Sequence, residues 1–209
     1  MANGPIQVTV VPEDRLIIVN GEVLFFDYSP LEENIHAIQW RDNKGHIEYE
    51  DGPNVELTVE DYESKVKPYV DFWKTEKDRI LEEQRKAEEE YNSLPNVRAR
   101  KLSELNASFI QAESDGTLES SVRFTIDANE RANRDIDGLI KALENNPEET
   151  VMFCAADNSF HEVTLDNLKT MQLEVIGYGQ QLYQTKWELR TRIMAAETKE
   201  ELDAIEIKF

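Results

Sequence analysis

The sequence predicts an α+β protein with a small N-terminal antiparallel β meander, a long charged helix, and a mostly helical C-terminal domain containing a short strand pair. Three observations lead to this class. Residues 6–49 carry apolar runs separated by turn residues, residues 59–91 have apolar side chains at helical spacing, and hydrophobic residues make up 40% of the 209-residue chain, which is enough for a core. We place domain boundaries after residues 58 and 94, which gives the parts 1–58, 59–94 and 95–209.

The N-terminal strands are indicated by alternation and by turn chemistry. Apolar and polar side chains alternate over residues 6–10. Asn20-Gly21 lies between two apolar runs, the second reaching Phe26, and this dipeptide suits the two positive φ angles of a type I′ hairpin turn. A second hairpin is expected around residues 42–45, so the meander continues to about Tyr49.

The long helix is expected to follow Thr58, a good N-cap, and to be interrupted or restarted at Pro68. Apolar residues recur every seven positions along it, as in a heptad pattern. The apolar pattern fails in the acidic stretch 82–90, so the end of the helix near Tyr91 should be solvated, and residues 93–96 should break it. The two recurring rows are Val66, Trp73, Ile80 and Ala87, and Tyr62 with Tyr69.

The second half should be mostly helical. We expect a helix over residues 97–112, a turn over 113–116, a strand formed by Val122, Phe124 and Ile126, and a helix capped by Asp127 that stops before Pro147. A strand pair should follow at residues 151–155 and 160–163.

Thr164 should open the longest helix, and Thr198 with Glu201 forms a capping box for a last short one. The longest helix contains Gly177 and Gly179, each of which costs about 1 kcal/mol relative to alanine. Leu168, Val175, Leu182 and Leu189 recur at intervals of seven along it, with Met171 and Tyr178 alongside.

Charge excludes some partners. The formal net charge is −20, which disfavours nucleic acid and anionic membrane surfaces, because both attract basic proteins. Residues 1–5 show no basic or apolar signal-peptide region, and no apolar stretch approaches the ~20 residues that span a bilayer. The single cysteine, Cys154, lies in an apolar run and is expected to be a buried, inert thiol in a reducing compartment.

The sequence predicts no enzyme: it contains no phosphate-binding loop, HExxH or CxxC motif, and we expect no catalytic residue, cofactor or metal. His36 and His46 could share a site on paired strands, and His161 lies near Asp157 and Glu162, but a metal site usually needs three or four ligands, so we interpret these as ordinary surface residues. Asp42-Asn43-Lys44-Gly45 places a lysine where a calcium loop needs oxygen, so it is a turn.

Close polar pairs are expected in so acidic a chain and need no catalytic explanation. Asp135 with Asp137 and Glu148-Glu149 are interpreted as solvated surface, since no partner with a differently perturbed pKa is evident. Ser120-Ser121 has no histidine nearby in the sequence.

The sharper features are the apolar rows of the two long helices. They either pack within their own domain, the more ordinary interpretation, or form a seam for another helix of the same or a second chain. Trp73 and Trp187 lie on or beside them, and Trp is a favoured interface residue. The candidate partner-binding residues are therefore Tyr69, Trp73, Ile80, Leu168, Val175, Leu182 and Leu189.

Several segments resemble a known protein family. Residues 6–12 (IQVTVVP), 17–21 (IIVNG) and 34–40 (NIHAIQW) resemble the N-terminal region of bacteriophage tail-fibre-assembly-type proteins, and 69–77 (YVDFWKTEK) resembles the helix that follows there. The second half is similar to an uncharacterised domain that often ends such proteins, in the segments 98–106 (RARKLSELN), 127–133 (DANERAN) and 156–164 (ADNSFHEVT).

The resemblance implies a protein that binds other proteins. The first hypothesis is a tail-fibre assembly factor, a chaperone acting in the host cytoplasm on tail-fibre or other tail proteins through the β meander and the exposed part of the long helix. The second is a permanent subunit of the virion tail or baseplate, with the helical rows as oligomer seams and a homo-oligomer left open. The third, a hydrolase, is disfavoured because the sequence carries no signature of a catalytic site.

Overall fold

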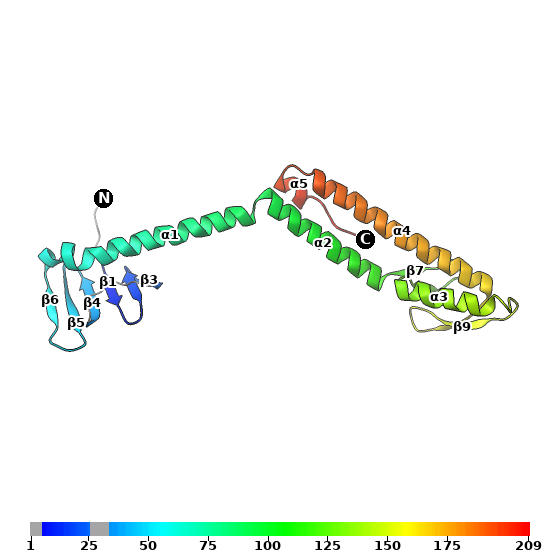
Figure 1. Ribbon diagram of the computed structural model, residues 1–209, viewed down its shortest axis with the longest axis horizontal. Coiled ribbons are helices and arrows are strands. Elements are labelled where there is room, and N and C mark those ends of the chain that lie inside the picture. Colours follow the sequence, from blue (N-terminus) through cyan, green and yellow to red (C-terminus); the bar gives the residue numbers. More distant parts are fainter. Residues whose placement is uncertain (1–5, 26–33) are drawn as a thin grey trace. The chain divides into compact units, whose positions relative to one another are not determined.

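The computed structural model describes residues 6–25 and 34–209 and divides the chain into two compact units, Met1–Glu89 and Glu90–Phe209. Figure 1 labels most of their helices and strands. Residues 1–5, where no signal peptide was expected, and Phe26, predicted to end a strand, lie outside the described residues. The predicted α+β class is confirmed, with the N-terminal meander, long helices and short strand pair all present.

The first unit contains a six-stranded antiparallel sheet in the order β3-β2-β1-β4-β5-β6. Two three-stranded meanders make this sheet, and they join where β1 pairs with β4. The last strand, β6, follows the stretch in which strands were predicted. The strands are β1 (Val8–Val11), β2 (Leu16–Val19), β3 (Glu22–Phe25), β4 (Ile35–Arg41), β5 (Lys44–Tyr49) and β6 (Val55–Leu57).

Both predicted hairpin turns form. Asn20 and Gly21 have φ angles of 52° and 84°, the two positive values that a type I′ turn needs. The second turn is tighter than expected, because Asp42 and Asn43 are its central residues and Arg41 pairs with Lys44. Gly45 is therefore a strand residue, opposite Trp40. A Cβ atom there would lie 2.2 Å from the carbonyl oxygen of Gln39.

The long helix begins irregularly. A 3₁₀ turn, η1 (Val59–Asp61), and a π turn, η2 (Tyr62–Val66), precede α1 (Lys67–Tyr91). The Asp61 carboxylate accepts hydrogen bonds from the backbone N–H and hydroxyl of Thr58 at 2.8 and 2.9 Å. Lys67 donates its N–H to Tyr62, five residues earlier, and Pro68 has no N–H to donate. The predicted restart at Pro68 is thus a change from π to α geometry.

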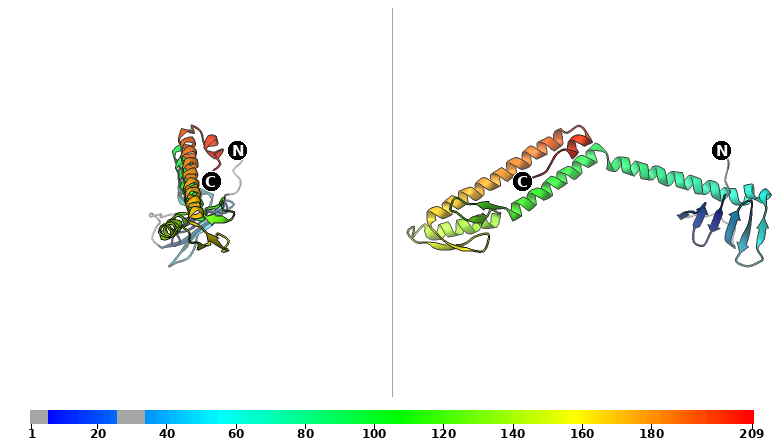
Figure 2. Two further views of the ribbon diagram at one scale, coloured as in Figure 1. Left: turned by 90° about the vertical axis from the view of Figure 1, so that its right-hand side faces the viewer. Right: turned by 180° about the vertical axis from the view of Figure 1, so that it is seen from behind.

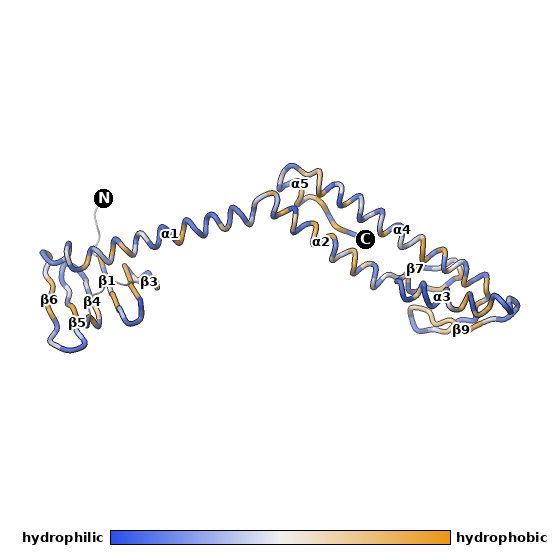
Figure 3. Tube along the Cα trace, in the orientation of Figure 1, coloured by the Kyte–Doolittle hydropathy of each residue, from blue (hydrophilic) through white to orange (hydrophobic). Residues whose placement is uncertain are grey.

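Only the first half of α1 is packed. Val66, Val70 and Trp73 are buried with the core-facing residues of the sheet, such as Val10, Ile38 and Trp40. Residues 81–90 are all exposed, and their hydrophilic character is visible along α1 in Figure 3. The predicted solvated end is confirmed. Residues 59–94 are therefore not a separate part, since their first turns belong to the sheet's core.

The second unit is built on two long helices that lie side by side, α2 (Leu94–Asp115) and α4 (Leu165–Ala195), as both views of Figure 2 show. The hairpin β7–β8, the helix α3 and the hairpin β9–β10 pack at one end, and α5 lies at the other. Their bounds are β7 (Thr117–Glu119), β8 (Thr125–Asp127), α3 (Glu130–Leu143), β9 (Val151–Cys154), β10 (Phe160–Val163) and α5 (Lys199–Asp203).

Helix caps in this unit are mostly as predicted. The Thr164 and Thr198 side chains accept hydrogen bonds from the backbone N–H groups of Asn167 and Glu201, at 3.2 and 3.1 Å. Asp127 was wrong as a cap. It ends β8, and Asn129 caps α3 by accepting from the N–H of Ala132 at 2.9 Å.

Two further predictions are corrected here. The strand expected over Val122, Phe124 and Ile126 is present only at Ile126, which lies in β8, whereas Val122 and Phe124 belong to the turn that joins β7 to β8. The turn expected over residues 113–116 is mostly helical, because α2 continues to Asp115. None of the helices within the described residues has the length and apolar character needed to cross a membrane.

Candidate functional site

Six of the seven predicted partner-binding residues lie in or beside the cores of their own units. Trp73, Leu168, Val175, Leu182 and Leu189 are buried. Tyr69 and Ile80 are half-buried, Tyr69 against the core of the first unit. Over a few turns, a heptad pattern and an ordinary amphipathic helix place apolar residues on the same face. Each row therefore stabilises the unit to which it belongs and does not offer a free surface.

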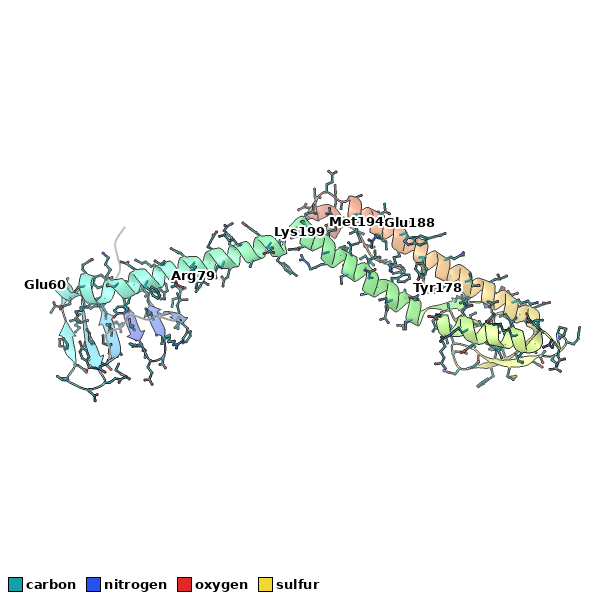
Figure 4. The ribbon with its side chains drawn as sticks, in the orientation of Figure 1. Glu60, Arg79, Tyr178, Glu188, Met194 and Lys199 are labelled. Atoms are coloured by element: carbon teal, nitrogen blue, oxygen red, sulfur yellow. The ribbon has the colours of Figure 1, made fainter. Side chains whose placement is uncertain are left out.

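A second apolar row on α4 is exposed, and Trp187 is its one member that the sequence singled out as an interface residue. We call it the α4 outer stripe: Leu173, Ile176, Tyr183, Trp187 and Met194. Leu173 is 71% and Trp187 61% exposed. Leu173, Trp187 and Met194 fall on one spacing of seven, which is the signal that could have revealed the stripe from the sequence. Met194 is labelled near the end of α4 in Figure 4.

One edge of the stripe is anchored to α2. The Tyr183 ring lies 4.9 Å from the buried Phe109 ring and 5.9 Å from Trp187. The Lys186 ammonium lies 4.0 Å from the Phe109 ring centre, a cation–π contact. Tyr183 and Trp187 are thus held in place while their outer faces remain in water. Large apolar side chains gathered in this way mark protein-binding surfaces.

The first unit offers a second apolar surface at the edge of its sheet. Among the described residues, β3 pairs only with β2, so its other edge is free. Phe25 is 71% exposed and Val23 is exposed beside it. Glu22 of the same strand forms a 2.5 Å ion pair with Lys77 of α1. A free strand edge with exposed apolar residues can pair with another extended chain.

His36 and His46, which could have shared a site, are not paired with each other across the strands. His36 is the extra residue of a β-bulge and is exposed, while His46 lies opposite Gln39. Glu48 accepts a hydrogen bond from the Gln39 amide at 2.9 Å and lies 2.8 Å from the His46 ring nitrogen. Within residues 6–25 and 34–209, no three His, Cys, Asp or Glu residues are grouped to hold a metal ion.

The serine–histidine pair of the second unit has a structural explanation. Ser159 lies between the Asp157 carboxylate at 2.6 Å and the His161 ring nitrogen at 2.8 Å, and its backbone N–H also donates to Asp157. The serine is therefore in the middle, whereas a catalytic triad needs the histidine there. His161 stacks on Phe124 with 4.1 Å between ring centres. Hydrogen bonds from Ser159 lower the pKa of Asp157. The same hydrogen bonds stabilise the hairpin turn.

Ser120 and Ser121 attach their loop to α4. The Ser120 hydroxyl donates to Glu174 at 2.5 Å and the Ser121 N–H donates to it at 3.0 Å. Burial raises the pKa of Glu174, but these hydrogen bonds outweigh it and the net pKa is lowered. The Glu174 carboxylate therefore tethers the loop of Ser120 and Ser121 to α4 in its ionised form.

The remaining acidic pairs lie on the surface. Asp135 pairs with Arg131 at 3.7 Å, and Asp137 pairs with Lys141 at 2.6 Å, which lowers the pKa of Asp137. Glu148 and Glu149 are exposed. We find no reactive arrangement in these pairs.

The prediction of a buried Cys154 was wrong, because its thiol is exposed. The strand β9 has only one covered face: Val151 and Phe153 pack on the core of the second unit, and Met152 and Cys154 alternate with them toward solvent.

The comparisons with known proteins concern the second unit. No curated protein and no solved structure matches the chain. A family described as a domain of unknown function (DUF4376) matches residues 96–206, which are more than half of the chain and include nearly all of α2 and the whole of α3, α4 and α5. The chain therefore belongs to the DUF4376 family.

Proposed function

We propose that this protein is a non-enzymatic bacteriophage tail-fibre assembly factor, which binds fibre chains in the host cytoplasm and keeps them soluble until they assemble. The phage assignment is supported by the resemblance of residues 6–40 and 69–77 to such assembly proteins. The net charge of −20 suits a soluble carrier, since charge limits self-association.

The observation that carries the mode of binding is the edge of β3 that no strand within residues 6–25 and 34–209 covers, with Val23 and Phe25 exposed. An extended fibre segment could add to this edge as a further strand. Its backbone would pair with β3, and its alternate side chains would cover Phe25. The acidic stretch 82–90 provides an exposed charged surface on α1. Residues 82–89 of this stretch belong to the same unit as β3.

A matched pair of variants tests this mode. Phe25→Glu should abolish the solubilisation of co-expressed fibre chains, because it places a charge at the centre of the proposed contact. Val55→Glu, on the opposite edge strand β6, is the control and should retain full solubilisation. Equal solubilisation by both variants would remove the β3 edge from the proposal.

The α4 outer stripe favours a second function, a permanent structural subunit of the virion tail, in which the stripe is an oligomer seam. Quantitative mass spectrometry of purified virions separates the two functions. An assembly factor should be absent from virions, and fibres expressed without it should be insoluble. Stoichiometric presence in virions would support the structural subunit and contradict the assembly factor.

A further inference from the structure

We infer that the α4 outer stripe binds the same stripe of a second copy of this chain, with the two α4 helices antiparallel. The inference concerns the second unit and is independent of the proposed role in fibre assembly. It rests on three features of α4: the period of the exposed residues, the charge beside them, and two glycines that packing within one chain does not explain.

The period is that of a two-helix seam. Leu173, Gln180, Trp187 and Met194 are seven apart, and Ile176, Tyr183 and Arg190 follow the first three of them by three residues. This is the a/d pattern by which one helix keeps a single face toward another over several turns. At about 1.5 Å per residue, the stripe from Leu173 to Met194 is ~32 Å long.

The buried row of α4 lies on a different face. Val175 and Leu182 are each two residues after a member of the first exposed series, which is about 200° around the helix. The inner row packs on the helix's own unit, so the outer stripe is left for a separate contact.

The charge near the stripe permits self-association. In a chain with a net charge of −20, α4 contains only three acidic residues, Asp166, Glu174 and Glu188, against four basic ones. Between Leu173 and Met194, the positions that flank the stripe in a heptad pattern are Gly177, Gly179, Gln184, Lys186, Thr191 and the buried Ile193. None of them is acidic, so two copies of this face meet without the repulsion that other surfaces of so acidic a protein would bring.

Gly177 and Gly179 point to the orientation. A Cβ atom on either would meet nothing within 4 Å, so packing inside the chain does not require glycine there. Each nevertheless costs about 1 kcal/mol in a helix interior. A large side chain approaching from a second helix would use the space that they leave, and Trp187 is the largest residue of the stripe.

An antiparallel pair brings these features together. When its two-fold axis passes between Gln180 and Tyr183, Trp187 of each copy lies against the turn Ile176–Gly179 of the other. Leu173 then lies level with Arg190 of the other copy. A parallel pair would oppose Trp187 to Trp187 and glycine to glycine, which leaves crowding at one level and a gap at another.

Sedimentation velocity of the full chain over a concentration series tests the association. The natural protein should form dimers, and Trp187→Glu should weaken the dimer roughly 30-fold or more, as loss of a central interface tryptophan does. Leu81→Glu, an exposed apolar position on α1, is the control and should leave the dimer unchanged. A chain that stays monomeric, or a dimer that tolerates Trp187→Glu, would overturn the inference.

A second variant, Gly179→Leu, distinguishes a loss of the dimer contact from misfolding of the chain. Within one chain it replaces a helix-breaking residue in open space, so the helical content and thermal stability of the monomer should be maintained or rise. The same change fills the space proposed for Trp187 and should weaken the dimer. An unchanged or tighter dimer of Gly179→Leu would contradict the glycine argument.

Disulfide trapping tests the orientation in a Cys154→Ser background, which removes the natural exposed thiol. Leu173→Cys mixed with Arg190→Cys should give a cross-linked heterodimer. Leu173→Cys alone should not cross-link to itself. Self-cross-linking of Leu173→Cys without the mixed product would show a parallel pair and refute the antiparallel arrangement.

Discussion

Replacing Trp73 by alanine should destabilise the first unit by about 3–5 kcal/mol. The side chain is 7% exposed and packs with Val66 and Val70 in the sheet's core. Truncation removes roughly 150 Å² of buried apolar surface, which at about 25 cal/mol per Å² corresponds to ~4 kcal/mol. The Lys77 ammonium, 4.9 Å from the ring centre, adds a cation–π contact that is lost as well.

The indole N–H provides a second, finer comparison. Trp73 Nε1 is buried without a hydrogen-bond partner among the described residues. Trp73→Phe keeps most of the apolar surface and removes this unpartnered donor, whose burial costs about 1–3 kcal/mol. Trp73→Phe should therefore cost much less than Trp73→Ala, below ~1.5 kcal/mol.

The assay is urea unfolding in a Trp187→Phe background, so that the fluorescence comes from Trp40 and, where it is retained, Trp73, and reports on the first unit. Leu81→Ala, exposed on the same helix, is the control and should change the free energy of unfolding by less than ~0.5 kcal/mol. A loss below ~1 kcal/mol for Trp73→Ala would refute a core role for this tryptophan.

Three further outcomes are expected. Gly45→Ala should destabilise the first unit by about 1–3 kcal/mol, because its Cβ would collide with a backbone oxygen, and circular dichroism melts should show the loss. Acidification below the ordinary pKa of Glu174 should progressively destabilise the second unit: the folded-state pKa is lowered, so the stabilisation is present above the unfolded pKa and is lost as pH falls through the folded one. Glu174→Gln should reduce this acid dependence in pH-resolved denaturant titrations, and an unchanged dependence would contradict the tether. Thr164→Ala should cost the second unit about 1 kcal/mol by removing the N-cap of α4, whereas Thr164→Ser should be nearly neutral in the same measurement.

The features predicted correctly from the sequence are those determined by a few neighbouring residues. The Asn20-Gly21 turn follows from the backbone freedom of two residues. The caps at Thr164 and Thr198 need only a hydroxyl three residues before a free N–H. The solvated end of α1 follows from the acidic stretch over residues 82–90.

The errors arise where contacts between segments distant in the sequence determine the local structure. Asp127 and Asn129 are both good caps, but the N–H of Ala128 bonds to Gly116 across the hairpin, so the strand pairing reaches Ala128 and the helix begins after it. The exposure of Cys154 depends on which face of β9 is covered.

The candidate surfaces also combine a feature that the sequence predicts with one that depends on the tertiary structure. The spacing in α4 indicates apolar rows, but only the tertiary structure distinguishes the buried row of Leu168, Val175, Leu182 and Leu189 from the exposed one. The free edge of β3 could not be predicted either, since it depends on the order of the strands in the sheet.

The exposed second half of α1 has a consequence for how the protein denatures. Residues 81–90 bury no side chain in either unit, and ion pairs such as Arg79–Glu83 and Arg85–Glu82 support the helix only weakly, by about 0.2–0.5 kcal/mol each. Such a segment can fray while both cores remain intact, so it cannot make their melting cooperative. Calorimetry should then resolve two heat-absorption peaks, and a single melting temperature would describe neither unit.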